Sequence, residues 1–179
     1  MRKLPPSFFI IVIIGAIGSV LVAHYDDFLF YRWQTYTALD RSFSIELPDK
    51  PSEETTQIPT EDGGTAVVHL VSVKPNKHSV FSCAYTNRDT PEEKTADRIL
   101  HSALEGSMRK IQGKVVSQKE ITVQGNPGLE IRASARNNST VDARLIVVGS
   151  RLYMIMIVDT EQSNDDKAVR RVFQSFKLS

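Results

Sequence analysis

Residues Lys114–Ala135 read KVVSQKEITVQGNPGLEIRASA, two extended segments separated by a cluster of turn-forming residues. The first segment, Lys114–Val123, runs directly into Gln124–Gly128, where glycine, asparagine and proline gather. The second segment, Leu129–Ala135, alternates apolar and polar side chains, which is the period of a strand with one buried face. Because the connection is short, we expect the two strands to pair as an antiparallel hairpin.

The same period-two pattern recurs on both sides of this hairpin. Each further candidate strand is bounded by glycine, proline, asparagine or aspartate, which favour turns. The short connections predict that neighbouring strands are mostly antiparallel. The further candidate strands are Phe43–Leu47, Thr55–Ile58, Thr65–Lys74, Ser79–Tyr85, Val141–Val148 and Leu152–Val158.

Two segments change to helical spacing. Thr90 can cap a helix, and Glu93 can complete a capping box with it. Apolar residues then recur along one helical face until Gly113, which is a typical helix stop. A second amphipathic helix should start near Ser163 or Asn164. The resulting order of four strands, helix, four strands, helix predicts an α+β fold, a mostly antiparallel sheet sandwiched by helices.

The composition excludes several classes of protein and of site. The 22 basic and 21 acidic residues give a net charge of +1, too small an excess for a dedicated nucleic-acid binder. A single cysteine excludes an internal disulfide and cysteine-rich zinc sites. This Cys83 alternates with Phe81 and Tyr85 on one strand face, so we expect a buried, unreactive thiol. The length of 179 residues suits one domain with an appendage.

The appendage is N-terminal. No charged residue occurs between Lys3 and Asp26, and residues 7–25 are apolar enough to cross a bilayer as one transmembrane signal-anchor helix. Two basic residues precede this run, so residues 1–6 should stay cytoplasmic and the rest should be exported. The alternative is a signal peptide cleaved after Gly18 or, with a poorer fit because of Leu21, after Ala23, which would release a secreted protein. The apolar residues after Gly18 favour the uncleaved anchor.

Residues 26–37 are interpreted as an aromatic juxtamembrane linker to an extracytoplasmic domain that covers residues 38–179. Aromatic side chains favour the headgroup region of a bilayer, so we predict that four of them form a collar at the membrane interface. The alternative, that some of them pack on the folded domain, stays open. The four residues are Tyr25, Phe28, Tyr31 and Trp33.

The sequence assigns no catalytic, cofactor-binding or metal-ligating residue. None of the four histidines has ligand spacing, and neither a nucleophile elbow nor a phosphate loop occurs. His69 lies on an otherwise apolar strand face, where we expect a hydrogen-bonded, half-buried side chain. Acidic pairs leave a weak Ca²⁺ or Mg²⁺ site as an alternative, although helix N-termini and solvated loops explain them. The pairs are Glu53–Glu54, Glu61–Asp62, Glu92–Glu93 and Asp165–Asp166.

Several of these motifs together resemble bacterial exported domains of the PsbP-like fold superfamily. The resemblance covers about residues 33–179 and rests on a proline-terminated strand, a glycine-rich turn and a final amphipathic helix. It implies an antiparallel sheet between helices and a non-catalytic accessory or binding module, with no catalytic motif to place on these positions. The residues that carry it are Phe43–Pro48, Lys50–Pro51, Val115–Ile121, Gln124–Gly128, Val148–Tyr153 and Phe173–Lys177.

The sequence therefore predicts a single-pass, membrane-anchored extracytoplasmic accessory domain without catalytic activity or cofactor. Its expected partner is another envelope protein, and its oligomeric state is left open. One alternative is a small-molecule or weak divalent-cation binding module. A less favoured alternative is a hydrolase whose site does not form a sequence motif.

Overall fold

The computed structural model describes residues 31–59, 65–87, 95–136, 138–160 and 166–179. Within these ranges, no helix is long and apolar enough to cross a membrane. The span predicted at residues 7–25 and the first residues of the predicted linker lie outside the described residues.

Seven strands form one large antiparallel sheet with the order β3-β4-β5-β9-β8-β7-β6. The hairpin predicted from residues 114–135 is present as β6 and β7, with Gln118 opposite Ile131 and Ile121 opposite Gly128. The strands of this sheet are β3 (Ser52–Pro59), β4 (Thr65–Val73), β5 (Ser79–Asn87), β6 (Lys114–Val123), β7 (Asn126–Ser134), β8 (Thr140–Val148) and β9 (Arg151–Asp159).

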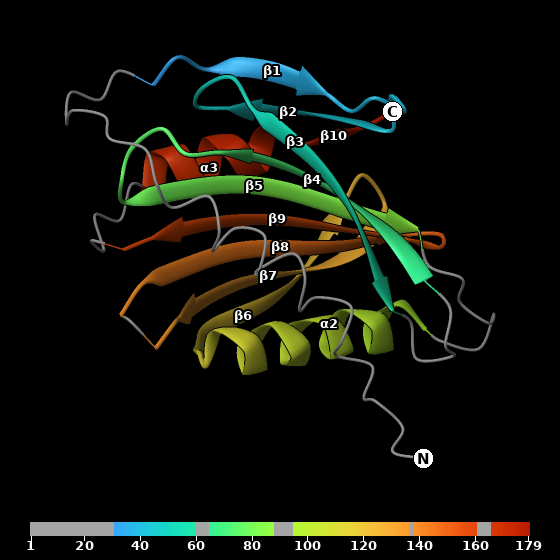
Figure 1. The fold of residues 1–179 in the computed structure, drawn as a ribbon. Coiled ribbons are helices and arrows are strands. Elements are labelled where there is room, and N and C mark those ends of the chain that lie inside the picture. Colours follow the sequence, from blue (N-terminus) through green and yellow to red (C-terminus); the bar gives the residue numbers. More distant parts are fainter. Residues whose placement is uncertain (1–30, 60–64, 88–94, 137, 161–165) are drawn as a thin grey trace.

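Two layers cover the large sheet. Helix α2 (Ala96–Ile111) lies on one face, as Figure 1 shows. Helix α3 (Asp166–Ser175) lies on the opposite face beside a second, three-stranded sheet with the order β1-β2-β10. The small sheet consists of β1 (Gln34–Thr37), β2 (Phe43–Leu47) and β10 (Lys177–Leu178). The predicted antiparallel sheet between helices is confirmed.

The structure has two strands, β1 and β10, that the predicted order of elements did not include. β1 falls within residues 26–37, and its mostly exposed side chains carry no strand-like alternation. β10 has only two residues. Both strands exist through pairing with β2, where Gln34 lies opposite Leu47 and Leu178 lies opposite Phe43. Strands that depend on such tertiary pairing leave a weak local signal.

The core under α2 matches the predicted helix stripe. Ile99, Leu100 and Leu104 are buried against alternate residues of the large sheet, among them Leu129 and Leu145. A buried aliphatic side chain of this kind contributes about 1.5–3 kcal/mol to stability. This packing fixes α2 on the face of the sheet opposite to α3.

The core on the other face is aromatic and centres on Phe43. The Phe43 ring is fully buried and lies 5.5 Å from Tyr85, 5.7 Å from Tyr153 and 5.5 Å from Phe176, measured between ring centroids. These residues come from β2, β5, β9 and the position directly after α3. One side chain therefore joins the small sheet, the large sheet and the C-terminus.

The ends of α2 differ from the prediction. Thr95 rather than Thr90 is the N-cap, and its Oγ1 accepts a hydrogen bond from the Arg98 N–H at 3.5 Å. Thr90 lies outside the described residues. At the other end, Gln112 rather than Gly113 adopts the left-handed conformation, with φ of 48°. The stop is thus one residue earlier, because a glutamine takes the position that usually favours glycine.

The turn of the β6–β7 hairpin is shorter than the predicted five-residue cluster. Gln124 and Gly125 both have positive φ, 48° and 81°, as a two-residue hairpin turn requires. Pro127 and Gly128 already belong to β7. The Gln124 side chain also accepts a hydrogen bond from the Leu178 N–H at 2.7 Å, which ties β10 to the hairpin.

The β1–β2 turn is tied to β9 by a carboxylate whose pKa is shifted. Burial by itself would raise the pKa of Asp40, but hydrogen bonds from Ser42 and Arg151 outweigh it and lower the pKa from 3.8 to about 2. A depressed carboxyl pKa stabilises the fold above the unfolded-state pKa, and this contribution is lost as pH falls through the folded-state pKa.

We therefore expect Asp40→Asn to remove about 1 kcal/mol of stability at pH 7, a figure reduced for the partial exposure of this carboxylate. The difference between the variant and the native chain should shrink between about pH 4 and pH 2. Denaturant unfolding at several pH values measures it. Asp49→Asn, which removes an exposed carboxylate bonded to the Lys50 N–H, is the control. An unchanged difference across this pH range would contradict the assignment.

Candidate functional site

The cysteine is part of the aromatic core, as predicted. Cys83 is fully buried and lies in the same cluster as Phe81 and Tyr85. Burial raises the pKa of its thiol well above the ordinary value. A thiol in this environment lacks the thiolate form that nucleophilic catalysis requires.

We expect Cys83 to resist a thiol reagent at about pH 8 while the chain is folded, and to react at once in denaturant. The reaction rate should follow global unfolding, because the thiol has no exposed surface. A chromogenic disulfide reagent measures this rate directly. Fast stoichiometric labelling of the folded chain would contradict the burial and revive the hydrolase alternative.

The histidines make structural contacts. His69 is half-buried, its Nδ1 lies 3.1 Å from Thr55 Oγ1, and its ring stacks on Tyr85 at 4.7 Å between centroids. The expectation of a hydrogen-bonded, half-buried side chain is confirmed. His101 lies 3.1 Å from the Asp97 carboxylate, one turn earlier on α2. The ring nitrogens of His69 and His101 thus contact Thr55 and Asp97, whereas a general base for a thiol would contact Cys83.

The acidic pairs do not form a metal site in the described part of the chain. No group of three or more His, Cys, Asp or Glu residues there has metal-binding geometry. Glu61–Asp62 and Glu92–Glu93 lie outside the described residues. Asp166 instead accepts a hydrogen bond from Arg132 at 2.7 Å, and this guanidinium lowers the pKa of Asp166, with a smaller contribution from Arg170.

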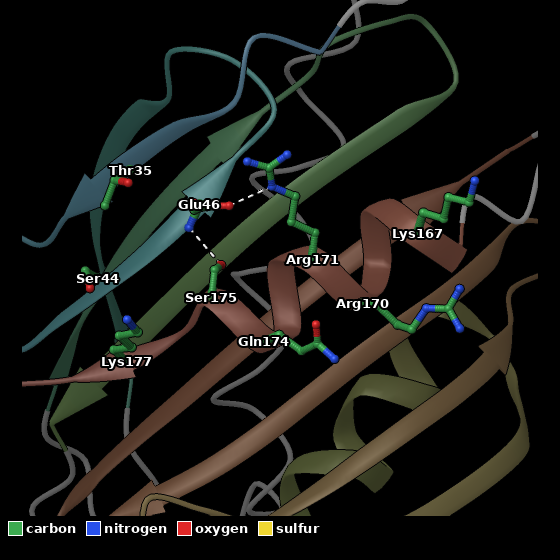
Figure 2. A pocket seen from close by; sticks show the side chains of 9 residues that line it. All are labelled: Thr35, Ser44, Glu46, Lys167, Arg170, Arg171, Gln174, Ser175 and Lys177. Carbon is green, nitrogen blue, oxygen red and sulfur yellow. Dashed lines mark hydrogen bonds and ion pairs between the residues drawn. The ribbon is translucent and has the colours of Figure 1, made fainter.

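The best candidate site is a basic groove between α3 and the small sheet (Figure 2). It is an open hollow of about 590 Å³. Four of its lining side chains are basic, one is acidic, and the others are hydroxyl or amide groups. The lining residues are Thr35, Ser44, Glu46, Lys167, Arg170, Arg171, Gln174, Ser175 and Lys177.

The groove arises from the amphipathic pattern of α3. Ala168, Val172 and Phe173 are buried on one face. Lys167, Arg170, Arg171 and Gln174 follow the spacing i, i+3, i+4 and i+7, which places them along the opposite side. Ser175 fixes the end of the helix against β2, because its Oγ accepts the Glu46 N–H at 2.9 Å. Lys177 on β10 then adds a fourth basic side chain.

The charges of the groove are unbalanced. Arg171 donates to the Glu46 carboxylate at 2.6 Å and lies 4.3 Å from the centre of the Trp33 ring. Lys167, Arg170 and Lys177 form no ion pair with any other described residue. Guanidinium and ammonium groups beside hydroxyl groups suit phosphate or carboxylate oxygens. The arrangement can therefore bind an anionic group.

A second hollow, of about 470 Å³, lies on the other side of α3. Two of its arginines are paired with carboxylates: Arg132 donates to Asp142 at 2.7 Å, and Arg144 donates to Glu130 at 2.7 Å. The Arg144 guanidinium also lies 4.6 Å from the Phe173 ring centre. Both pairs join β7 to β8, and they leave less unbalanced charge for a ligand than the basic groove has. The contacts that hold α3 on the sheet are those of Arg132 with Asp166 and of Arg144 with the Phe173 carbonyl oxygen.

Comparison with known proteins places the fold. No family model matches the chain, and no curated protein matches it. The structure resembles the solution structure of cyanobacterial PsbP (CyanoP) from Synechocystis sp. PCC 6803, with a TM-score of 0.58 and 12% identity over 88% of this chain and 99% of that one. The chain has a PsbP-like fold.

A further structural match is the crystal structure of protein PA94 from Pseudomonas aeruginosa, a protein of unknown function described as a putative regulator. Its TM-score is 0.47, with 11% identity over 80% of this chain and 94% of that one. The PsbP-like fold expected from the sequence motifs is thus shown by the structure of CyanoP, and this likeness speaks for the fold alone.

The structure describes two of the four aromatic residues that were predicted at the membrane interface. Tyr31 and Trp33 are half-buried on its surface, and Tyr31 lies 6.0 Å from Phe81 between ring centroids. These two side chains therefore pack on the domain, and the collar at the membrane interface stays a prediction. Tyr25 and Phe28 lie outside the described residues.

The sequence interpretation missed the basic groove. The only local signal was the spacing of Lys167, Arg170 and Arg171 on the polar side of the final helix. Glu46 and Lys177 come from other strands, and no sequence spacing links them to the helix.

Proposed function

We propose that this chain is a non-catalytic accessory domain, held at the outer face of a membrane by residues 7–25, that binds an anionic group in its basic groove. The observation that carries the proposal is the excess of basic over acidic side chains in the groove. The described cysteine and histidines are occupied in structural contacts, which favours binding over nucleophilic catalysis.

The anchor part of the proposal rests on the sequence. The uncharged run of residues 7–25 is long enough to span a bilayer, and the basic residues before it favour a cytoplasmic N-terminus. The packing of Tyr31 and Trp33 on the domain supports a short connection, because Tyr31 follows the end of the predicted span by only six residues.

Alkaline extraction of membranes from a bacterial host that expresses the full chain tests the anchor. We expect the chain to remain in the membrane pellet, and external protease to digest the domain once the outer barrier is removed. A chain that appears in the soluble exported fraction, with an N-terminus near residue 19 or 24, would show cleavage and overturn the anchor.

A protein partner is supported by a second surface. β6 is an edge strand, and its residues Val115 and Val116 are exposed by 42% and 66%. An unpaired strand edge with exposed apolar side chains is a common place for another chain to pair. We therefore propose β6 as the contact with another envelope protein.

A photocrosslinker at position 116 in living cells tests this contact. We expect one stoichiometric adduct from position 116 and none from position 54, an exposed site on the opposite edge strand β3. Equal adducts from both positions, or none from either, would contradict the assignment of β6.

A small anionic molecule is the second candidate ligand of the groove. The volume of about 590 Å³ falls in the range typical of small-molecule sites. A divalent cation is disfavoured there, because four basic side chains would repel it.

A further inference from the structure

The basic groove lies next to the point where the chain joins the PsbP-like domain. Trp33 packs beneath Arg171, and Arg171 lines the groove. The first described residue, Tyr31, packs on Phe81 of the same core. Six peptide steps separate Tyr31 from Tyr25 at the end of the predicted span, and they reach at most about 20 Å. The groove is therefore held close to the surface of the membrane that the span crosses.

The positive charge of the groove is local. Only two charged residues, both basic, occur before Asp26, so the remainder of the chain has 20 basic and 21 acidic residues. Against this near-neutral background, Lys167, Arg170 and Lys177 face solvent without an ion pair to any described residue. Such a patch is attracted to anionic surfaces over about one Debye length, roughly 8–10 Å at physiological salt.

We propose that the basic groove binds the phosphate groups of anionic phospholipids in the outer leaflet of the membrane that anchors the chain. This inference rests on the proposed anchor, because the tether supplies the proximity. A short tether raises the effective concentration of the headgroups, so that a groove of modest intrinsic affinity is occupied. Docking in this way fixes the orientation of the domain relative to the membrane.

Lipid is favoured over an acidic protein segment for two reasons. The lipid surface is within reach of the tether without any further component. A bound peptide normally inserts a large side chain into an apolar pocket, and the lining of the groove contains no large apolar side chain. A lipid headgroup instead requires basic and hydroxyl groups, which the groove has. Each basic side chain near an anionic surface changes partitioning on the order of fivefold.

The test uses the full chain reconstituted in vesicles. Thr35→Cys places a thiol in the groove on exposed β1, and a fluorescent donor can be attached there because native Cys83 is fully buried. Energy transfer to a headgroup-labelled lipid reports how close the groove lies to the bilayer. Vesicles of phosphatidylcholine alone are compared with vesicles that contain about 30% phosphatidylglycerol.

We expect transfer to rise with phosphatidylglycerol and to fall again at about 0.5 M salt, where charge interactions are screened. The triple variant Lys167→Gln, Arg170→Gln, Lys177→Gln should lose the rise, a loss of tenfold or more in apparent headgroup binding. The matched control removes three exposed basic groups elsewhere and should keep the rise. The control variant is Lys50→Gln, Arg98→Gln, Lys114→Gln.

Four results would overturn the inference. Equal energy transfer in both vesicle types, or an equal loss of transfer in the two triple variants, would show that the groove does not bind the lipid. Displacement by millimolar glycerol phosphate at constant ionic strength would assign the groove to a soluble phosphate compound, and displacement by a soluble polyglutamate at the same ionic strength would assign it to an acidic protein segment. Alkaline extraction of the same vesicles distinguishes a groove that does not bind lipid from an anchor that does not hold. A chain that is extracted from both vesicle types would overturn the proposed anchor itself.

Discussion

Replacing Phe43 with alanine is expected to lower the free energy of unfolding by about 3–5 kcal/mol, the range for deleting a buried aromatic ring. Phe43 has no exposed surface, and its ring contacts rings from β5, from β9 and from Phe176, directly after α3. The cavity left behind would be lined by Tyr85, Tyr153 and Phe176. Tyr85 and Tyr153 belong to strands that are paired on both sides. These neighbours have little freedom to collapse into the space.

Denaturant unfolding of the full chain in mild detergent measures this loss. Leu39→Ala is the matched control, because Leu39 lies in the turn just before β2 and is 80% exposed. We expect the control to change stability by less than about 0.5 kcal/mol. Similar effects for the two variants would mean that the small sheet does not pack on the large sheet as described.

Replacing Gly128 with alanine is expected to lower stability by about 2–3 kcal/mol, the cost of forcing extra volume into a packed site. A Cβ at this position would lie 2.6 Å from the Leu145 carbonyl oxygen and 3.2 Å from an Ile121 side-chain carbon. The oxygen belongs to the backbone of β8, which is paired on both sides. Relief therefore requires that the sheet itself shifts.

Gly125→Asn separates this crowding from an ordinary glycine effect. A Cβ at Gly125 would meet nothing within 4 Å, although the residue has φ of 81°. Asparagine tolerates the left-handed region, so we expect a loss of about 1 kcal/mol or less. Thermal unfolding of the two variants gives the comparison. A smaller loss for Gly128→Ala than for Gly125→Asn would contradict the close approach of β7 and β8.

The large sheet could be predicted because its strands carry their own signals. β7 alternates through Leu129, Ile131 and Ala133, all of them buried, and the turn before it contains Gly125. The start of α2 was placed too early because Thr90 and Thr95 both suit an N-cap, and local chemistry does not choose between them.

The small sheet and the groove could not be predicted from local patterns. β10 consists of Lys177 and Leu178, too short for any periodicity, and it is recognised only by its pairing with β2. Glu46 meets Arg171 across 125 positions of sequence. Contacts at that separation follow from the assembled fold, whereas the basic spacing on α3 was visible and equally typical of a solvated helix face.

Intact mass measurement of the chain purified from membranes tests the central claim, a binding domain held at the membrane by its own N-terminus. The account predicts the complete chain of 20.1 kDa, recovered from the alkali-resistant membrane fraction. A shorter species that lacks the residues up to Gly18 or Ala23, recovered from the soluble exported fraction, would contradict it.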